Sequence, residues 1–228
     1  MTGPAAALFD FDGTLVDREP LIEAAVLAAC RAAGVEPADG AVVIGRAWQD
    51  VHRDLGVESE LGWSVDELVD RARAHASLLI EAGHAPPVID GGAELIERLA
   101  GSGMPVAIVS GSTRAELHEG IELLGVGRHV SLVLGAEDYR AGKPDPEPYL
   151  LAAERLAVAP RRCVVFEDST VGIDAGLAAG MAVIAVTQAN RPVGVPGHQV
   201  HERAHRIVPT LSAVDDAMLV DLIGRVPS

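Results

Sequence analysis

The sequence predicts an α/β protein built on a doubly wound parallel β-sheet, with an all-helical domain inserted after the first strand. Three observations predict this fold class. Short apolar runs of strand length recur with little polar alternation, which is typical of strands buried on both faces of a parallel sheet. Helical patterns separate most of these runs, and one long stretch near the N-terminus contains helical patterns alone.

The strands are predicted from the apolar runs, of which four are clear and one, over 131–135, is weaker. In chain order they are AAALF (5–9), VAIVS (106–110), SLVLG (131–135), CVVFE (163–167) and AVIAV (182–186). Their length and continuous apolar character suit buried strands. We therefore expect them to pair as parallel strands of one sheet.

Helical patterns follow the strands over 92–103, 113–125 and 145–158. The first two end in glycine, a residue that often terminates a helix. Strands that alternate with helices form a Rossmann-like sheet with helices on both faces.

The stretch 18–87 breaks this alternation. Its helical patterns cover 19–34, 45–56 and 64–83, with no strand-like run between them. We interpret 18–87 as a helical cap domain inserted into a discontinuous Rossmann-like core of residues 1–17 and 88–228. The alternative is a long crossover within one domain, but this stretch is far longer than a normal connection.

Composition narrows the class of protein. The chain has 18 Lys and Arg against 33 Asp and Glu, a formal net charge of -15, which argues against a nucleic-acid partner because such a surface needs a basic stripe. No apolar run is long enough to cross a membrane, and no signal-peptide pattern precedes the first strand. Cys30 and Cys163 lack metal-ligand spacing and are interpreted as buried thiols. We expect a cytoplasmic protein that is a monomer or a weak homodimer.

Polar residues follow four of the predicted strands, at the edge where ligands bind in open α/β sheets. Asp10 and Asp12 follow the run 5–9, Ser110 and Gly111 follow the run 106–110, and Lys143 comes after the weak run 131–135. Glu167 and Asp168 lie at the end of the run 163–167. Four segments therefore bring acids, a lysine and a small-residue turn to one edge. Any one of them alone is compatible with an ordinary turn or a solvated loop.

Together these segments resemble the motifs of the haloacid dehalogenase superfamily of phosphotransferases. DFDGTLVD (10–17) resembles the first motif, VSGS (109–112) the second, GKPDPEPY (142–149) the third and FEDS (166–169) the fourth. Their order and spacing match over essentially the whole chain. The helical insertion is similar to the cap of the branch that contains beta-phosphoglucomutase and small sugar-phosphate phosphatases.

The chemistry of phosphoryl transfer fits these residue types. Asp10 suits the nucleophile, because a carboxylate can form an aspartyl-phosphate, and Asp12 can protonate the leaving oxygen and then deprotonate the attacking water. The resemblance implies the same two roles, and it implies that Asp12 binds the metal through its backbone carbonyl. Ser110 and the backbone near Gly111 can bind phosphate oxygens, while Lys143 supplies a point charge.

The acidic residues predict a Mg²⁺ site. Asp10, Glu167 and Asp168 would repel one another without a cation, and oxygen ligands that leave room for water and phosphate suit Mg²⁺. With the backbone carbonyl of Asp12, these residues form the predicted metal site.

We expect a phosphatase that acts on a small phosphorylated metabolite. Asp12 argues against a dehalogenase, which has no leaving alkoxide to protonate. The beta-phosphoglucomutase pattern has threonine and histidine where this sequence has Arg18 and Ile22, which argues against a mutase. A phosphomutase and a relative that binds a phosphorylated metabolite without catalysis are the alternatives.

The roles of two further groups of residues are not decided by the sequence. Arg18, Arg46, Trp48, His52 and Arg53 belong to the predicted cap and are candidates for substrate contact. The segment HERAH (201–205) has the His-Glu-x-x-His spacing of zinc peptidases, yet it lies in a Pro/Gly-rich connection without a third ligand. We interpret this match as coincidental and keep a zinc peptidase using His201, Glu202 and His205 only as an outside alternative.

Overall fold

The protein is described by a computed structural model that covers the chain apart from residues 1–5, 37–42, 44–47, 196 and 224–228. The chain divides into two compact units. One contains Met1–Val16, Val88–Asn190 and Gln199–Ser228, and the other contains Asp17–Pro87 and Arg191–His198. Residues 191–198, predicted to belong to the core, group with the helical residues in the structure. The role of these helices as a cap stays a prediction.

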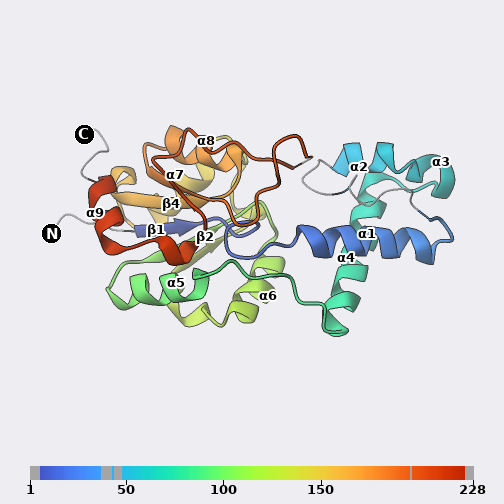
Figure 1. Ribbon diagram of the computed structural model, residues 1–228, viewed down its shortest axis with the longest axis horizontal. Helices are drawn as coiled ribbons and strands as arrows, with labels where there is room; N and C mark the ends of the chain where they lie inside the picture. The colour runs from blue at the N-terminus through green and yellow to red at the C-terminus, as the bar shows by residue number, and fades with distance from the viewer. Residues whose placement is uncertain (1–5, 37–42, 44–47, 196, 224–228) are drawn as a thin grey trace. The chain divides into compact units, whose positions relative to one another are not determined.

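The first unit is built on one parallel sheet of six strands in the order β3-β2-β1-β4-β5-β6 (Figure 1). The strands are β1 (Ala6–Phe9), β2 (Val106–Val109), β3 (Leu132–Leu134), β4 (Cys163–Glu167), β5 (Ala182–Val186) and β6 (Arg206–Val208). The predicted doubly wound fold is confirmed. The strand order reverses between β1 and β4, where Phe9 lies opposite Phe166, and such a reversal opens a crevice at the carboxyl edge.

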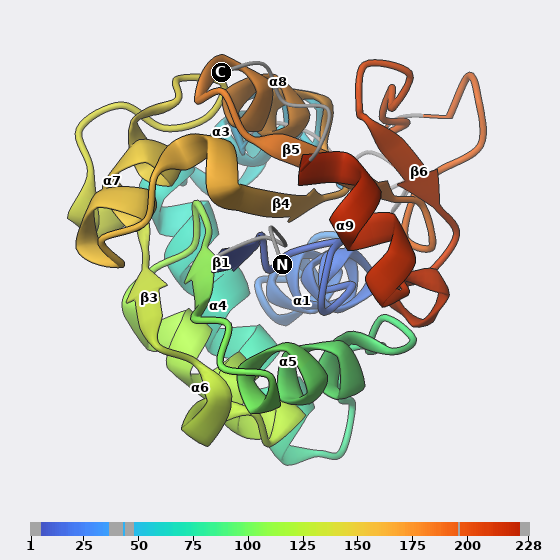
Figure 2. The ribbon, with the colours of Figure 1, turned by 90° about the vertical axis from the view of Figure 1, so that its left-hand side faces the viewer.

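Alternate residues of each strand point to opposite faces of the sheet, so each face has its own core. One core joins Phe9 and Phe166, whose rings stack with centroids 4.4 Å apart, to helices α5 (Gly92–Gly101), α6 (Arg114–Leu124) and α9 (Asp216–Ile223). The other joins Leu8 and Val165 to helices α7 (Glu147–Arg155) and α8 (Thr170–Ala178). Figure 2 shows α7 and α8 on one side of the sheet and α5 and α6 on the other.

Local signals explain where the predicted helices begin and end. At the start of α6, the Thr113 side chain accepts a hydrogen bond from the Glu116 N–H while Glu116 accepts one from the Thr113 N–H, and the helix ends before Gly125 at φ 69°. Such a cap contributes about 1 kcal/mol. Short 3₁₀ turns complete the connections: η2 (Gly127–His129), η3 (Ala136–Asp138), η4 (Pro160–Arg162) and η5 (Leu211–Ala213).

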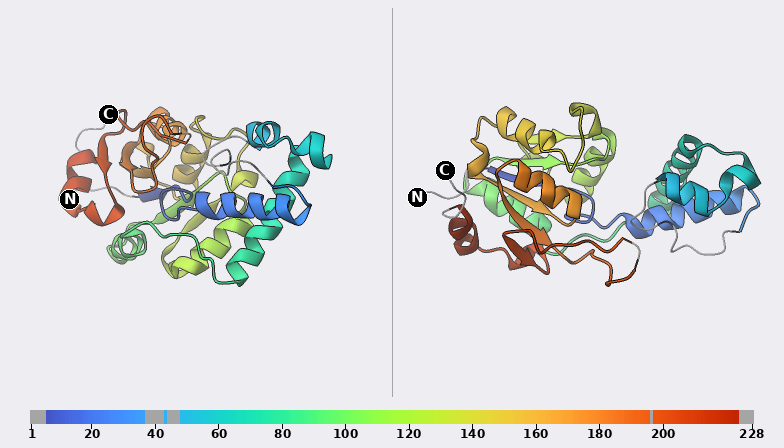
Figure 3. Two further views of the ribbon diagram at one scale, coloured as in Figure 1. Left: turned by 45° about the vertical axis from the view of Figure 1, so that its right-hand side comes forward. Right: turned by 90° about the horizontal axis from the view of Figure 1, so that it is seen from above.

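Within the second unit, the helices lie between Asp17 and Pro87, whereas the described residues of 191–198 form turns and irregular chain (Figure 3). Its helices are α1 (Glu19–Ala32), α2 (Trp48–Asp54), α3 (Val57–Leu61) and α4 (Val65–Glu81). They enclose a core that includes Val26, Trp63 and Leu68. The first three residues of the helix predicted over 45–56 lie outside the described residues, and α2 ends at Asp54 because Gly56 turns the chain at φ 64° into α3.

Strand β6 was not predicted from the sequence, which indicates only a Pro/Gly-rich connection there. Arg206 pairs with Ile184 at the start of this short edge strand. Its residues RIV are too few to produce a periodic signal, so the neighbouring strand β5 determines that they pair. Among the described residues, no helix is both long and apolar enough to cross a membrane.

Candidate active site

Three carboxylates meet at the carboxyl edge of the sheet, beside the reversal of strand order. Asp10 directly follows β1, Glu167 ends β4, and Asp168 begins the turn into α8. One carboxylate oxygen from each lies within 4.8 Å of the others. Glu167 is fully buried and Asp10 is 7% exposed, so their charges are largely removed from water.

Lys143 joins two of these carboxylates. Its Nζ lies 2.5 Å from Asp10 Oδ1 and 2.5 Å from Glu167 Oε1, and it donates to the Val109 carbonyl at 3.1 Å. Buried charges are stable only when they are paired and hydrogen-bonded. The structure therefore brings together four of the sequence-predicted site residues, from three separate segments.

The carboxylate of Glu167 is saturated by protein donors. Oε1 accepts from Lys143 Nζ and, at 2.7 Å, from the Tyr149 hydroxyl. Oε2 accepts from Ser169 Oγ at 3.0 Å and from the N–H groups of Asp168 and Ser169 at 3.2 Å. An ionised carboxylate offers about four lone-pair sites, so Glu167 reaches a cation only by giving up one of these partners.

Asp168 is held by the turn that follows β1. Thr14 Oγ1 donates to Asp168 Oδ1 at 3.1 Å. Gly13 has φ +85°, and a Cβ at that position would lie 2.1 Å from Asp168 Oδ2. Only glycine permits both the left-handed backbone and this close approach, so the DGT turn is shaped around Asp168.

The carboxylate of Asp12 is not one of the three that lie within 4.8 Å of one another. It accepts a hydrogen bond from Ser112 Oγ at 2.6 Å and is partly exposed. The turn that carries it is closed by a hydrogen bond from the Gly13 N–H to the Val16 carbonyl at 2.8 Å. A partly exposed carboxylate that already binds a hydroxyl is well placed to exchange a proton with substrate or water.

The turn after β2 carries the predicted phosphate-binding residues. Ser110 is 2% exposed, and its carbonyl accepts a hydrogen bond from the Tyr139 hydroxyl at 2.8 Å. The Ser112 N–H points back to Ser110 Oγ at 3.2 Å, while Gly111 is exposed. The Tyr139 hydroxyl thus holds the Ser110 end of the turn, while Gly111 is exposed to solvent.

The crowding of acids perturbs their ionisation. Burial raises the pKa of Asp10 to about 7, with Glu167 and Asp12 adding to the effect and Lys143 opposing it. Burial also raises the pKa of Asp168 well above its usual range, with Asp10 and Glu167 adding to it. For Lys143, burial lowers the pKa, but Asp10 and Glu167 outweigh it and hold the pKa well above its usual range. One lysine does not balance three acids, and this donor set of hard oxygens fits a divalent cation such as Mg²⁺.

Sequence reasoning did not assign Tyr149 or Ser169 to the site, and it named His201 only for the zinc alternative, although all three shape the site. Tyr149 lies in the third motif segment, and its ring is fully buried with Lys143 Nζ 5.0 Å from the ring centroid. Ser169 caps α8 by accepting from the Gly172 N–H at 3.0 Å. For Ser169, the sequence offered one signal, a serine directly before a helix, which predicts a capping role.

Three of the five candidate substrate residues, Trp48, His52 and Arg53, have partners within the helical unit. His52 is buried, with Nε2 lying 2.6 Å from the Trp63 carbonyl. Arg53 pairs with Asp50 and Asp54 on the surface. Trp48 packs against the core of the unit. Arg18 stands at the start of α1, and Arg46 lies outside the described residues.

The HERAH segment is not a zinc site of the peptidase type. It forms a turn and not a helix, so the i, i+4 geometry that such a site requires is absent from it. His201 Nε2 lies 2.6 Å from the Asp168 carbonyl, whereas His205 Nδ1 accepts from the Val183 N–H at 3.1 Å. The two imidazoles therefore bind different elements.

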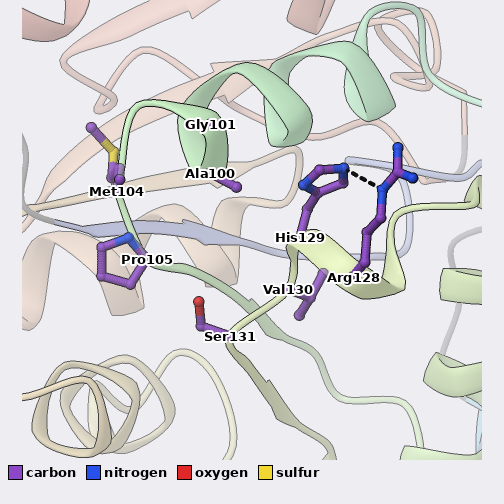
Figure 4. A pocket seen from close by; sticks show the side chains of 9 residues that line it. Ala100, Gly101, Met104, Pro105, Arg128, His129, Val130 and Ser131 are labelled. Atoms are coloured by element: carbon purple, nitrogen blue, oxygen red, sulfur yellow. Dashed lines mark hydrogen bonds between the residues drawn. The ribbon is translucent and has the colours of Figure 1, made fainter.

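A shallow pocket of about 390 Å³ lies where the chain enters β2 and β3, and its lining includes none of the predicted site residues. Figure 4 shows Arg128 and His129 side by side, joined by a hydrogen bond of 2.9 Å. Both side chains also lie 3.6 Å from Glu97 Oε1. Because ligands of such folds bind at the opposite edge of the sheet, this pocket does not belong to the candidate active site.

Comparisons with known proteins agree with this geometry. Residues 7–186 match the family model described as haloacid dehalogenase-like hydrolase. The validoxylamine A 7'-phosphate phosphatase of Streptomyces hygroscopicus subsp. limoneus is 35% identical over 184 residues, which cover 79% of this chain and 84% of that protein. Hexitol phosphatase A of Escherichia coli (strain K12) is 34% identical over 193 residues, covering 83% and 84%.

Solved structures share the fold. The beta-phosphoglucomutase of Clostridium difficile has a TM-score of 0.72 at 20% identity and covers 97% of each chain. A likeness at this level of identity establishes the fold and not the reaction.

Proposed function

The chain belongs to the haloacid dehalogenase-like hydrolases, and we propose that it is a Mg²⁺-dependent phosphatase that hydrolyses a small phosphomonoester through an aspartyl-phosphate on Asp10. The observation that carries this proposal is the buried cluster of Asp10, Glu167 and Asp168 with Lys143 Nζ 2.5 Å from the first two. Such a cluster combines a nucleophile with the positive charge that phosphoryl transfer requires.

Asp10 is the proposed nucleophile. A carboxylate oxygen of Asp10 attacks phosphorus, and the bond from phosphorus to the alcohol oxygen of the substrate breaks. Lys143 orients the Asp10 carboxylate through Oδ1, and its charge stabilises the negative charge on the phosphoryl oxygens. A nucleophile already held in its reactive orientation loses less entropy on reaching the transition state, which lowers the activation barrier.

Asp12 is the proposed general acid and base. It gives a proton to the departing alcohol oxygen, and then takes one from the water that attacks the aspartyl-phosphate, which releases phosphate and restores Asp10. The Ser112 hydroxyl, 2.6 Å from Asp12 Oδ2, holds the carboxylate during both transfers. Asp12 stays in contact with water, as a group that exchanges protons in both directions must.

The metal belongs to the carboxylate cluster. Asp10 and Asp168 would hold Mg²⁺ through their side chains, Asp12 through its backbone carbonyl, and Glu167 as a further ligand or as the anchor of Lys143. When bound, the ion supplies positive charge that keeps the carboxylates ionised and neutralises the transferring phosphoryl group.

Phosphate oxygens would bind at Ser110, at the backbone of Gly111 and at Lys143. The Tyr139 hydroxyl supports this turn through the Ser110 carbonyl. We propose a small substrate of the sugar-phosphate or polyol-phosphate class, because the two relatives above are named as a validoxylamine A 7'-phosphate phosphatase and a hexitol phosphatase. A cytoplasmic location fits such a metabolite.

The mutase alternative is disfavoured by Arg18 and Ile22, which stand where the mutase pattern has threonine and histidine.

Phosphate release from a panel of hexose and hexitol phosphates tests the proposal, with Mg²⁺, with EDTA, and with the Asp10→Asn variant. We expect Mg²⁺-dependent release by the wild type and a loss of at least about a thousandfold in the variant. Release that persists in EDTA or in Asp10→Asn would refute the mechanism. Conversion of a sugar 1-phosphate to its 6-phosphate without net release would identify a mutase.

A further inference from the structure

We propose that His201 is a positioning residue of the metal site: its imidazole holds the main chain of Asp168 and thereby raises the affinity of the site for a divalent cation. The inference rests on the proposed function, in which Asp168 is a metal ligand. His201 lies outside the four motif segments, in the segment whose HERAH pattern resembles a zinc motif.

The contacts of His201 determine its tautomer. The side chain is only 7% exposed. Its Nε2 lies 2.6 Å from the Asp168 carbonyl oxygen, and because a carbonyl only accepts hydrogen bonds, Nε2 carries the hydrogen. Nδ1 is then an acceptor, and it faces Asn190 Nδ2 at 3.3 Å, which donates to it. The imidazole is thus hydrogen-bonded at both nitrogens.

The same segment binds the Asp168 turn at two more points. The Thr170 N–H donates to Gln199 Oε1 at 2.9 Å, and the Val200 N–H donates to Thr170 Oγ1 at 2.9 Å. Asn190 and Gln199 are themselves joined by hydrogen bonds of 2.8 and 3.0 Å. Residues 199–201 therefore form a clamp along residues 168–170.

Asp168 is consequently held from two directions. Thr14 binds its carboxylate, and His201 binds its carbonyl. Burial raises the free energy of the ionised Asp168 carboxylate beside Asp10 and Glu167, so without restraint the turn would relax away from its neighbours. The clamp keeps the carboxylate near the other two acids before any cation arrives, and such outer partners typically contribute about tenfold or more to metal affinity.

Calorimetric titration of the metal-free protein with Mg²⁺, in the absence of substrate, tests the proposal in the wild type and in His201→Gln. His205→Gln is the matched control. It removes another imidazole of the same segment, one that accepts a hydrogen bond from strand β5 and has none to Asp168. Thermal unfolding of each metal-free variant reports any loss of folding. Phosphate release is then measured against Mg²⁺ concentration.

We expect the Kd for Mg²⁺ to rise about tenfold in His201→Gln and to change less than twofold in His205→Gln. At saturating Mg²⁺ the kcat of His201→Gln should return to within about threefold of the wild type, because the chemical groups are intact. A role in folding alone would lower the unfolding temperature and leave the Kd unchanged. An unchanged Kd in His201→Gln, or an equal rise in the control, would overturn the proposal.

Two further outcomes are distinguished: a variant that does not fold, and a wild type that lacks the proposed activity. If His201→Gln does not fold, His201→Asn replaces it, since the shorter side chain loses the contact with the Asp168 carbonyl; an unchanged Kd in that variant also overturns the proposal. If the wild type itself neither binds Mg²⁺ nor releases phosphate, the proposed function fails, and the role of His201 falls with it.

Discussion

Glu167 stands at the centre of the site although it is not a reacting group. Its two oxygens accept from Lys143, Tyr149, Ser169 and the main chain of the turn. A buried carboxylate that binds this many donors is rigid, because any movement leaves a donor unsatisfied. The position of Lys143, and through it that of Asp10, therefore depends on a network that includes the Tyr149 hydroxyl.

Tyr149→Phe tests this dependence. The variant keeps the buried ring and loses only the 2.7 Å hydrogen bond to Glu167. We expect kcat to fall about tenfold, with KM little changed, because Lys143 and Asp10 lose some of their orientation. Steady-state kinetics on the best substrate of the panel measures both constants.

The other tyrosine of the chain provides the matched comparison. Tyr139→Phe removes a hydroxyl that supports the Ser110 carbonyl of the phosphate-binding turn, so we expect its main effect on KM. Equal effects of the two substitutions on kcat would mean that the Tyr149 hydroxyl has no special role in orienting the catalytic groups.

At the scale of elements, helix α8 begins where the acidic turn ends. Ser169 caps it, and Gly172 in its first turn lies against Glu167, so that a Cβ there would be 1.8 Å from Glu167 Oε1. The Glu167 carboxylate therefore occupies the space that a side chain at position 172 would need. Helix α8 is placed close to β4 by this contact.

Gly172→Ala is expected to destabilise the protein by about 1–3 kcal/mol through overpacking and to displace Glu167. Gly101→Ala, at the end of helix α5 with nothing within 4 Å of its added Cβ, is the control and should leave stability unchanged or raise it by up to about 1 kcal/mol. Urea unfolding and phosphate release measure the two effects. A Gly172→Ala protein with wild-type stability and activity would contradict the close packing described here.

For the whole molecule, the buried acids connect stability to pH. The pKa of Asp10 is about 7 in the folded protein against 3.8 for an ordinary aspartate, and the pKa of Asp168 is raised as well. The folded state therefore binds more protons than the unfolded state between these values, and its stability falls as pH rises from about 4 to about 7.

We expect the unfolding temperature of the metal-free wild type to decrease, relative to that of Asp10→Asn, as pH rises from 5 to 8. Mg²⁺ should restore the wild type above pH 7 and have little effect on the variant, since a cation relieves the repulsion that ionisation creates. Differential scanning calorimetry with and without EDTA measures this. A difference between the two proteins that is independent of pH would show that Asp10 ionises as an ordinary aspartate.

The reactivity of the two cysteine thiols tests whether each unit is tightly packed around its cysteine. Cys163 lies in strand β4 and Cys30 in helix α1, and both are buried and unpaired. Burial raises the pKa of Cys163 to about 12 and also raises that of Cys30. Because the thiolate is the reactive form, we expect no rapid reaction with a disulfide reagent in the native protein and two thiols per chain after denaturation. Rapid modification of either cysteine in the native state would contradict its burial.

The sequence by itself determined the fold class, five of the six strands and the order of the chemical segments. These follow from local properties: continuous apolar runs, helical periodicity, capping residues such as Thr113, and the rule that polar residues after parallel strands meet at one edge. Asp10, Lys143, Glu167 and Asp168 could be predicted to converge for that reason, and they do.

Only the tertiary structure decided which groups hold these residues in place. The Tyr149 hydroxyl, the His201 imidazole and strand β6 each act through one contact with a distant part of the chain, as His201 does with Asp168, 33 positions away. A single hydrogen bond has no periodicity and leaves no pattern in the sequence. Its partners are chosen by burial, because a polar group that loses water must find whichever donor or acceptor the folded chain places beside it.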